Sequence, residues 1–146
     1  MAYSGKYIPE NREKYKGDPR NVTYRSSWEL QYMKWCDHSS KVIEWNSEEI
    51  IIPYTCPTDG RKHRYFTDFY VKTKDPKTGK ISQSIIEIKP FRETQKPERK
   101  RGKPRARLLK EVKTYVKNQA KWAHASAWCK KKGWNFFVLT ERDLFK

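Results

Sequence analysis

The spacing of apolar residues predicts helices in two parts of the chain. Ser26 and Glu29 form a capping-box pattern at the start of an apolar stripe, which predicts a helix over residues 27–37. Between residues 108 and 123, apolar side chains recur at intervals of three and four, the period of one helix face. We expect this second, longer helix to end at Gly133, because glycine readily adopts the left-handed conformation that closes helices.

Short runs rich in β-branched and aromatic residues predict strands. These runs are residues 41–45, 49–52, 64–72, 81–89 and 134–140. We expect Pro53 to end the second run, and the turn residues 75–80 to join the third and fourth as a β-hairpin. The last run is apolar enough to be buried on both faces.

The order of these elements predicts the fold class. Helix, strands, hairpin, long helix and strand together indicate an α/β (α+β) fold, with a single mixed sheet of about four strands flanked by helices. The length suits one domain over residues 1–146, and no internal repeat or linker is visible. Residues 1 to about 24 are polar and rich in turn residues, so we expect an irregular N-terminal arm.

Charge is distributed unevenly along the chain. Residues 1–73 hold 12 Lys or Arg against 10 Asp or Glu, whereas residues 74–146 hold 21 against 7, within a net charge of +16. Such clustering favours a polyanionic partner, with nucleic acid ahead of an anionic membrane surface. The alternative is a basic surface that serves only solubility.

The basic residues concentrate in one segment and on the helix that follows it. Residues 92–107 carry 8 basic and 2 acidic side chains without apolar periodicity, which predicts a mobile basic loop. On the following helix, lysines 110, 113, 117 and 121 form a stripe that is either a solvated face or a track for a phosphate backbone. We interpret the following residues as DNA-binding: Arg99, Lys100, Arg101, Lys103, Arg105, Arg107, Lys110, Lys113 and Lys117.

The cysteines and the apolar runs exclude several classes of protein. Cys36, Cys56 and Cys129 are odd in number and widely spaced, which argues against a disulfide framework. No Cys-x-x-Cys or His-x-x-x-His spacing occurs, so we expect no zinc. No run approaches the roughly 20 apolar residues of a membrane helix, and no secretory signal is recognisable. We therefore expect a soluble intracellular protein without a membrane partner.

Two acidic residues lie where β-structure disfavours them. Asp68 interrupts an aromatic run, and Glu87 shares one face of its predicted strand with Lys89. If the hairpin pairs, Asp68 and Glu87 lie near the same end of adjacent strands and offer two oxygen ligands to Mg²⁺ or Mn²⁺. Otherwise Asp68 is a solvated acid or a partner of Arg64, and Glu87 with Lys89 is a surface ion pair.

Together these residues resemble a known nuclease superfamily. Asp68, then Glu87-Ile88-Lys89 at 87 − 68 = 19 positions on, with Glu29 on a preceding helix, is similar to the PD-(D/E)XK nucleases. Four segments look more like the transposon end-cleaving endonucleases and the head completion nucleases of T-even-type phages. They are Ser-Trp-Glu, Tyr-Phe-Thr-Asp-Phe, Ile-Glu-Ile-Lys-Pro and Gly-Trp-Asn-Phe-Phe-Val-Leu-Thr-Glu. The resemblance spans about residues 25–144, and Thr67 stands where the superfamily's proline would precede the aspartate.

The resemblance implies a restriction-endonuclease-like core and a set of site residues. Asp68 and Glu87 would be metal ligands for Mg²⁺ (or Mn²⁺), assisted by the Ile88 carbonyl, and Lys89 would be the catalytic lysine. Glu29 would be the helix carboxylate that supports the metal site, although in a capping box its carboxylate simply reaches back to the Ser26 amide.

The resemblance also implies a biological role. It predicts a metal-dependent endonuclease that cuts double-stranded DNA with little sequence specificity, in phage head completion before head–tail joining. Phage head or neck proteins would be partners, in the host cell cytoplasm or in the virion. Two rivals stay open: a non-catalytic DNA-binding head–tail connector on a nuclease scaffold, and a junction-resolving or transposon end-cleaving nuclease.

Overall fold

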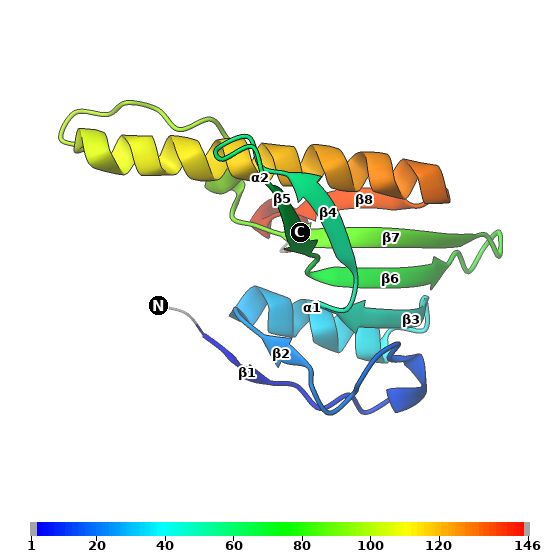
Figure 1. The fold of residues 1–146 in the computed structure, drawn as a ribbon. Helices are drawn as coiled ribbons and strands as arrows, with labels where there is room; N and C mark the ends of the chain where they lie inside the picture. Colours follow the sequence, from blue (N-terminus) through cyan, green and yellow to red (C-terminus); the bar gives the residue numbers. More distant parts are fainter. Residues whose placement is uncertain (1–2, 145–146) are drawn as a thin grey trace.

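A mixed four-stranded sheet forms the centre of the protein, whose computed structural model describes residues 3–144. The strand order is β3 (Val42–Ser47), β6 (Phe69–Lys74), β7 (Ile81–Ile88) and β8 (Asn135–Leu139). The first three strands are antiparallel neighbours, and β8 runs parallel to β7 (Figure 1). The predicted mixed sheet and the hairpin of β6 and β7 are therefore confirmed.

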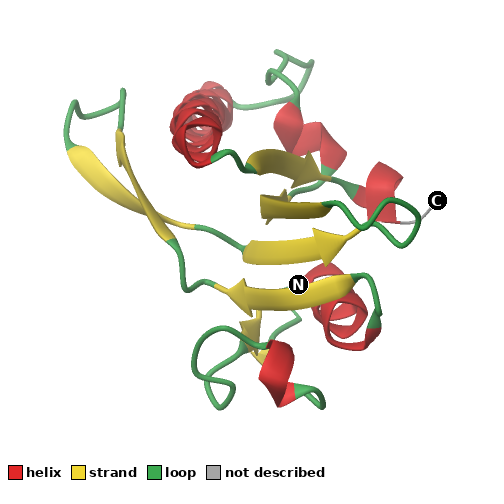
Figure 2. Cartoon of the chain, turned by 90° about the vertical axis from the view of Figure 1, so that its right-hand side faces the viewer, coloured by secondary structure: helices red, strands yellow, loops and turns green. Residues whose placement is uncertain are grey.

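Two helices cover opposite faces of this sheet (Figure 2): α1 (Ser27–His38) and α2 (Arg105–Lys132). Alternation along β7 divides the core, because Ile86 and Ile88 pack with α1 whereas Ile85 packs with Cys129 of α2. Both helix predictions are confirmed, although α2 begins at Arg105, three residues earlier than expected. Gly133 closes α2 at φ 74°, as its position predicted.

The predicted strand over residues 64–72 is wrong, because the chain breaks at Thr67 and Asp68. Residues before the break form β5 (Lys62–Phe66), which pairs with β4 (Ile51–Thr55) in a separate two-stranded ribbon. The ribbon packs against α2 through a cluster that includes Tyr65 and Trp122. Pro53 does not end its strand, because an isolated pair leaves β4 with an unpaired edge that needs no N–H donor.

Burial in the C-terminal half differs from the predicted pattern. The buried stripe of α2 is Asn118, Trp122, Ala125 and Cys129, whereas Val112 and Val116 remain 38% exposed. The first half of α2 extends past the sheet, so its apolar residues have little to pack against (Figure 1). Strand β8 is the edge of the sheet and is not buried on both faces, since the side chain of Phe137 is 48% exposed.

The N-terminal arm is more ordered than its composition suggested. Strand β1 (Gly5–Lys6) pairs with β2 (Thr23–Tyr24), and a 3₁₀ turn, η1 (Arg12–Lys14), lies between them. Tyr15 and Val22 join the core beside α1. The arm is therefore part of the folded layer on the α1 face.

The remaining elements are short. They are a 3₁₀ turn, η2 (Phe91–Thr94), at the start of the predicted basic loop, and α3 (Glu141–Leu144) after β8. All three cysteines are free thiols. Within residues 3–144, every helix is too short or too polar to cross a membrane.

Asp37 at the end of α1 anchors the arm. Its carboxylate is fully buried and accepts hydrogen bonds from the Tyr7 hydroxyl (2.6 Å) and the amides of Glu10 (2.8 Å) and Asn11 (2.9 Å). Burial alone would raise the pKa of Asp37, but these hydrogen bonds outweigh it and hold the pKa below its ordinary value. The contribution of Asp37 to stability is therefore present above the unfolded pKa and is lost as the pH falls through the folded one.

We expect Asp37→Asn to lower the free energy of unfolding by about 1.5–3 kcal/mol, the magnitude of a hydrogen bond to a charged group. The amide can accept at only one of its two terminal atoms, so at least one donor loses its partner. Urea unfolding at neutral pH measures the change, with exposed Asp18→Asn as control. Equal stability of the two variants would contradict an anchoring role.

Candidate active site

Asp68 and Glu87 come together where the ribbon joins the sheet. Asp68 lies in the break between β5 and β6, and its Oδ2 accepts a hydrogen bond of 2.9 Å from the amide of Ile88. Glu87 precedes Ile88 on β7 and is only 5% exposed. The hydrogen bond therefore fixes the Asp68 carboxylate to the strand end that carries Glu87.

Burial disfavours the charged forms of both carboxyls. Burial, followed by repulsion from Asp68, raises the pKa of Glu87 to about 8. Burial raises the pKa of Asp68 to about 6, even though the Ile88 amide and Lys89 favour its charged form. Both carboxylates resist ionisation because burial outweighs the attraction of Lys89, and hard oxygen donors of this kind suit a divalent ion. The Ile88 carbonyl follows Glu87 directly in the chain.

Glu29 and Lys89 belong to the same electrostatic group. The Nζ of Lys89 lies 3.9 Å from Oε1 of Glu87. Burial, followed by repulsion from Asp68, raises the pKa of Glu29 to about 7, although Glu29 lies on α1. Ser26 caps α1 by accepting the Glu29 amide, but the Glu29 carboxylate accepts the amide of Arg25 rather than that of Ser26. The four predicted catalytic residues thus gather in one place; their roles stay predictions.

The structure adds an ion pair, Glu48 with Arg25, that the sequence analysis did not predict. Glu48 has a φ of 57°, a left-handed conformation that is uncommon outside glycine and enriched at functional sites. Its amide donates to the carbonyl of Asp68 (3.2 Å), and its carboxylate binds Arg25 at 2.9 and 3.3 Å. Nothing in the polar turn at residues 46–49 signalled this position.

Two more residues reach the site from the α2 side of the sheet. The Tyr65 hydroxyl of β5 donates a hydrogen bond to Oε2 of Glu87. Lys121 of α2 holds its ammonium 5.5 Å from the centroid of the Tyr65 ring. Tyr65 looked like an ordinary strand residue, and Lys121 looked like the last member of a lysine stripe, because only the ribbon's packing on α2 brings them to Glu87.

Only some of the predicted DNA-binding residues line a common cavity. Between the basic loop and α2 lies a cavity of about 1160 Å³, and its lining includes Lys100, Arg101, Lys103, Arg107 and Lys110 but not Arg99, Arg105, Lys113 or Lys117. Arg105 and Arg107 belong to the first turn of α2, so the loop ends earlier than predicted. Lys103 is engaged internally, since its Nζ lies 2.7 Å from the Glu98 carbonyl and 2.8 Å from Glu111.

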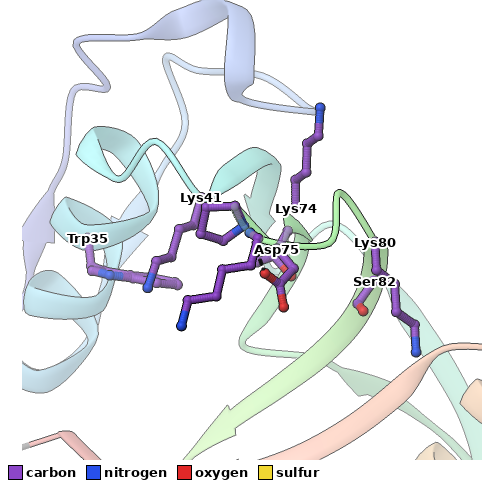
Figure 3. A pocket seen from close by; sticks show the side chains of 9 residues that line it. Trp35, Lys41, Lys74, Asp75, Lys80 and Ser82 are labelled. Atoms are coloured by element: carbon purple, nitrogen blue, oxygen red, sulfur yellow. Dashed lines mark hydrogen bonds between the residues drawn. The ribbon is translucent and has the colours of Figure 1, made fainter.

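A second, smaller cavity of about 560 Å³ lies at the turn of the β6–β7 hairpin. Figure 3 shows Lys41, Lys74 and Lys80 around it, together with Trp35 and Asp75. This turn is at the opposite end of β6 and β7 from Asp68 and Glu87. The cavity is therefore separate from the carboxylate group.

The turn of the ribbon holds a different group of side chains, of types that can ligate a metal. Ligand atoms of Cys56, Asp59 and His63 all lie within 4.8 Å of one another. The expectation of no zinc considered other spacings and overlooked this Cys-x2-Asp-x3-His arrangement. The side chains already bond one another or a neighbour, Asp59 to His63 at 2.7 Å and Cys56 to Thr58 at 3.0 Å. Three donors are one fewer than structural zinc ordinarily takes.

Comparisons with known proteins show the family to which the chain belongs. The model of the TnsA-like endonuclease N-terminal family matches residues 39–141, a span that contains Asp68, Glu87 and Lys89 but not Glu29. The head completion nuclease of Enterobacteria phage T4 is 41% identical over 147 residues, which cover 99% of this chain and 95% of the T4 protein. The mixed sheet between helices is consistent with the restriction-endonuclease-like core that the sequence implied. The chain is therefore a nuclease that belongs to the TnsA-like endonuclease family.

Proposed function

We propose that this protein hydrolyses phosphodiester bonds of double-stranded DNA in a reaction that depends on Mg²⁺ or Mn²⁺, with little sequence specificity. The observation that carries the proposal is the Asp68–Glu87 pair: Glu87 is buried, Asp68 is held by the Ile88 amide, and the pKa values of both carboxyls are raised. The net charge of +16 supports a polyanionic substrate, and the family match supports cleavage.

Each residue has a distinct part in the proposed reaction. Asp68 and Glu87, with the Ile88 carbonyl, would hold the cation, and Glu29 would support it from α1. When bound, a divalent cation supplies positive charge to the phosphate and lowers the pKa of water. Lys89, beside Glu87, would orient the attacking water, and Tyr65 would fix the Glu87 carboxylate by its hydrogen bond.

We also propose a role in phage assembly. The relationship to the T4 head completion nuclease supports action on packaged DNA in the host cytoplasm, with phage head or neck proteins as partners and a place in the virion. Grip on DNA by the exposed basic residues near the loop would be blind to sequence, because phosphate contacts carry no direct base information.

Asp68→Asn tests the catalytic centre. With Mg²⁺, we expect the wild-type protein to relax and linearise supercoiled plasmid, and the variant to be slower by about 100-fold or more, the scale of losing a key electrostatic group. Gel assays measure the rates, and exposed Glu13→Gln is the control. A variant that cuts as fast as wild type would reject the site. A wild type that binds DNA without cutting it would favour the connector alternative, and cutting confined to four-way junctions would favour a resolvase.

The carboxylates also predict how stability responds to pH. Asp68, Glu29 and Glu87 have folded pKa values of about 6, 7 and 8, above their unfolded values, so their favourable contribution is present at low pH and lost as the pH rises through these values. Without metal, the double variant Asp68→Asn/Glu87→Gln should gain thermal stability relative to wild type between pH 5 and pH 8.5.

Added Mg²⁺ should raise the Tm of wild type more at pH 8.5 than at pH 5, because cation binding requires deprotonated ligands. The double variant should not respond. Thermal unfolding in EDTA and in Mg²⁺ measures both effects. If the difference in Tm between the two proteins does not depend on pH, or if Mg²⁺ raises both Tm values equally, the carboxylates do not form the metal site.

Replacing Arg99, Lys100 and Arg101 with Ala should weaken DNA binding. If all three contact phosphates, the slope of log K against log [salt] should flatten by roughly 2.7, from about 0.9 per phosphate contact. Fluorescence anisotropy with a short duplex at several salt concentrations measures the slope. Alanine at Lys130 and Lys131, exposed at the far end of α2, is the control. An unchanged slope in the triple variant would exclude the loop from the interface.

A further inference from the structure

Lys121 differs from the other lysines of its row on α2. Lys110 and Lys113 are exposed. Lys117 and Lys121 are half-buried, and Lys121 holds its ammonium 5.5 Å from the ring centroid of Tyr65 and 6.0 Å from that of Tyr54. Burial lowers the pKa of Lys121, although attraction by Glu87 opposes the shift. Contact with two aromatic faces offsets part of the free energy of removing this cation from water.

The ribbon places this ammonium beside the carboxylates. Tyr65 supports Lys121 with its ring and donates its hydroxyl to Glu87, so a single side chain links the lysine to the site. Lys121 and Lys89 repel each other electrostatically, and both attract Glu87. Lys89 therefore approaches Glu87 from the end of β7, at 3.9 Å, whereas Lys121 approaches it from α2 through the Tyr65 side chain.

The charge of Lys121 is not taken up by an acidic partner. Among residues 3–144, no carboxylate oxygen lies within 4.0 Å of its Nζ, whereas Lys89 has Glu87 at 3.9 Å and Lys103 has Glu111 at 2.8 Å. A partly desolvated ammonium without an acidic partner is suited to bind an anion that enters the site.

The row of lysines gives that anion a path. Lys110, Lys113, Lys117 and Lys121 follow one another at helical spacings of three and four. At 1.5 Å of rise per residue, the row is about 16 Å long. One strand of DNA places about five phosphates over that length, at 3.4 Å of helix axis each. The row therefore runs from the basic loop to the Asp68–Glu87 pair, with Lys121 at the end nearest the carboxylates.

We propose that Lys121 is a second active-site lysine, whose ammonium binds a non-bridging oxygen of the DNA phosphate that enters the Asp68–Glu87 site. The proposal rests on the proposed nuclease function and adds where the phosphate is held. Lys89 and Lys121 then have separate roles, because Lys89 lies against Glu87 whereas Lys121 is free to contact the substrate.

Single-turnover cleavage of a duplex, at saturating protein with Mg²⁺, tests the proposal. Lys121→Met keeps the apolar stem and removes the charge, and we expect the rate to fall by about 100-fold, as for loss of one preorganised electrostatic group. Lys121→Arg should retain most of the activity. The matched control is Lys132→Met, which removes a lysine of the same helix that lies 4.8 and 5.7 Å from the rings of Trp128 and Trp134, away from the carboxylates.

A purely structural role for Lys121 predicts different results. It predicts that Lys121→Met and Lys132→Met lose Tm together and that both cut at rates near wild type, and it predicts no change in the salt dependence of cleavage. Our proposal predicts normal activity for Lys132→Met. For Lys121→Met, cleavage repeated at sub-saturating protein should give a salt slope of kcat/KM smaller by about 0.9, one phosphate contact. If Lys121→Met does not fold, Lys121→Gln replaces it in the same assays.

The outcomes separate the two levels of inference. Cleavage by wild type together with near-wild-type rates for Lys121→Met overturns the assignment of Lys121 and leaves the nuclease function standing. Lack of cleavage by wild type with either Mg²⁺ or Mn²⁺ overturns the proposed function and, with it, the role of Lys121.

Discussion

The hydrogen bond from the Ile88 amide to Asp68 is the contact on which the site depends. It forms only because the chain breaks between the ribbon and the sheet. Thr67 holds that break: it is fully buried, and both its amide and its hydroxyl donate to the carbonyl of Ile50. Thr67 stands where the PD-(D/E)XK motif has proline, so a pair of hydrogen bonds fixes the backbone that a rigid ring would otherwise fix.

Around that contact the protein tolerates an unfavourable concentration of charge. Three carboxyls with raised pKa values meet between the two helices, and each would be easier to bury as a neutral or apolar side chain. Lys89 and Lys121 offset this charge only in part. The Nζ of Lys89 lies 3.9 Å from Oε1 of Glu87, and Lys121 forms no ion pair within residues 3–144. An arrangement that opposes its own stability in this way is typical of a site that binds a cation and an anionic substrate.

The two halves of the chain supply different parts of the molecule. The N-terminal half, nearly neutral in charge, builds the layer around α1, where buried Asp37 ties the arm to the end of the helix. The C-terminal half supplies the basic loop and α2, whose first turns extend beyond the sheet (Figure 1). Positive charge therefore accumulates on the first turns of α2, which extend beyond the sheet, whereas the later turns of α2 pack into the core through Trp122, Ala125 and Cys129.

Local patterns in the sequence were sufficient for the helices, the β6–β7 hairpin and the acidic residues themselves. Ser26, Gly133 and the turn at residues 75–80 act on neighbouring backbone, so their effects can be read from short segments. Tertiary packing decided the rest. The split at Thr67, the phase of the buried face of α2 and the placement of Tyr65, Glu48 and Lys121 all depend on contacts between residues distant in the chain. Periodicity shows which residues share a face, but not what that face will meet. For this reason the sequence left the lysine row open as a solvated face or a phosphate track, and only the packing of the ribbon places the Tyr65 ring beside Lys121.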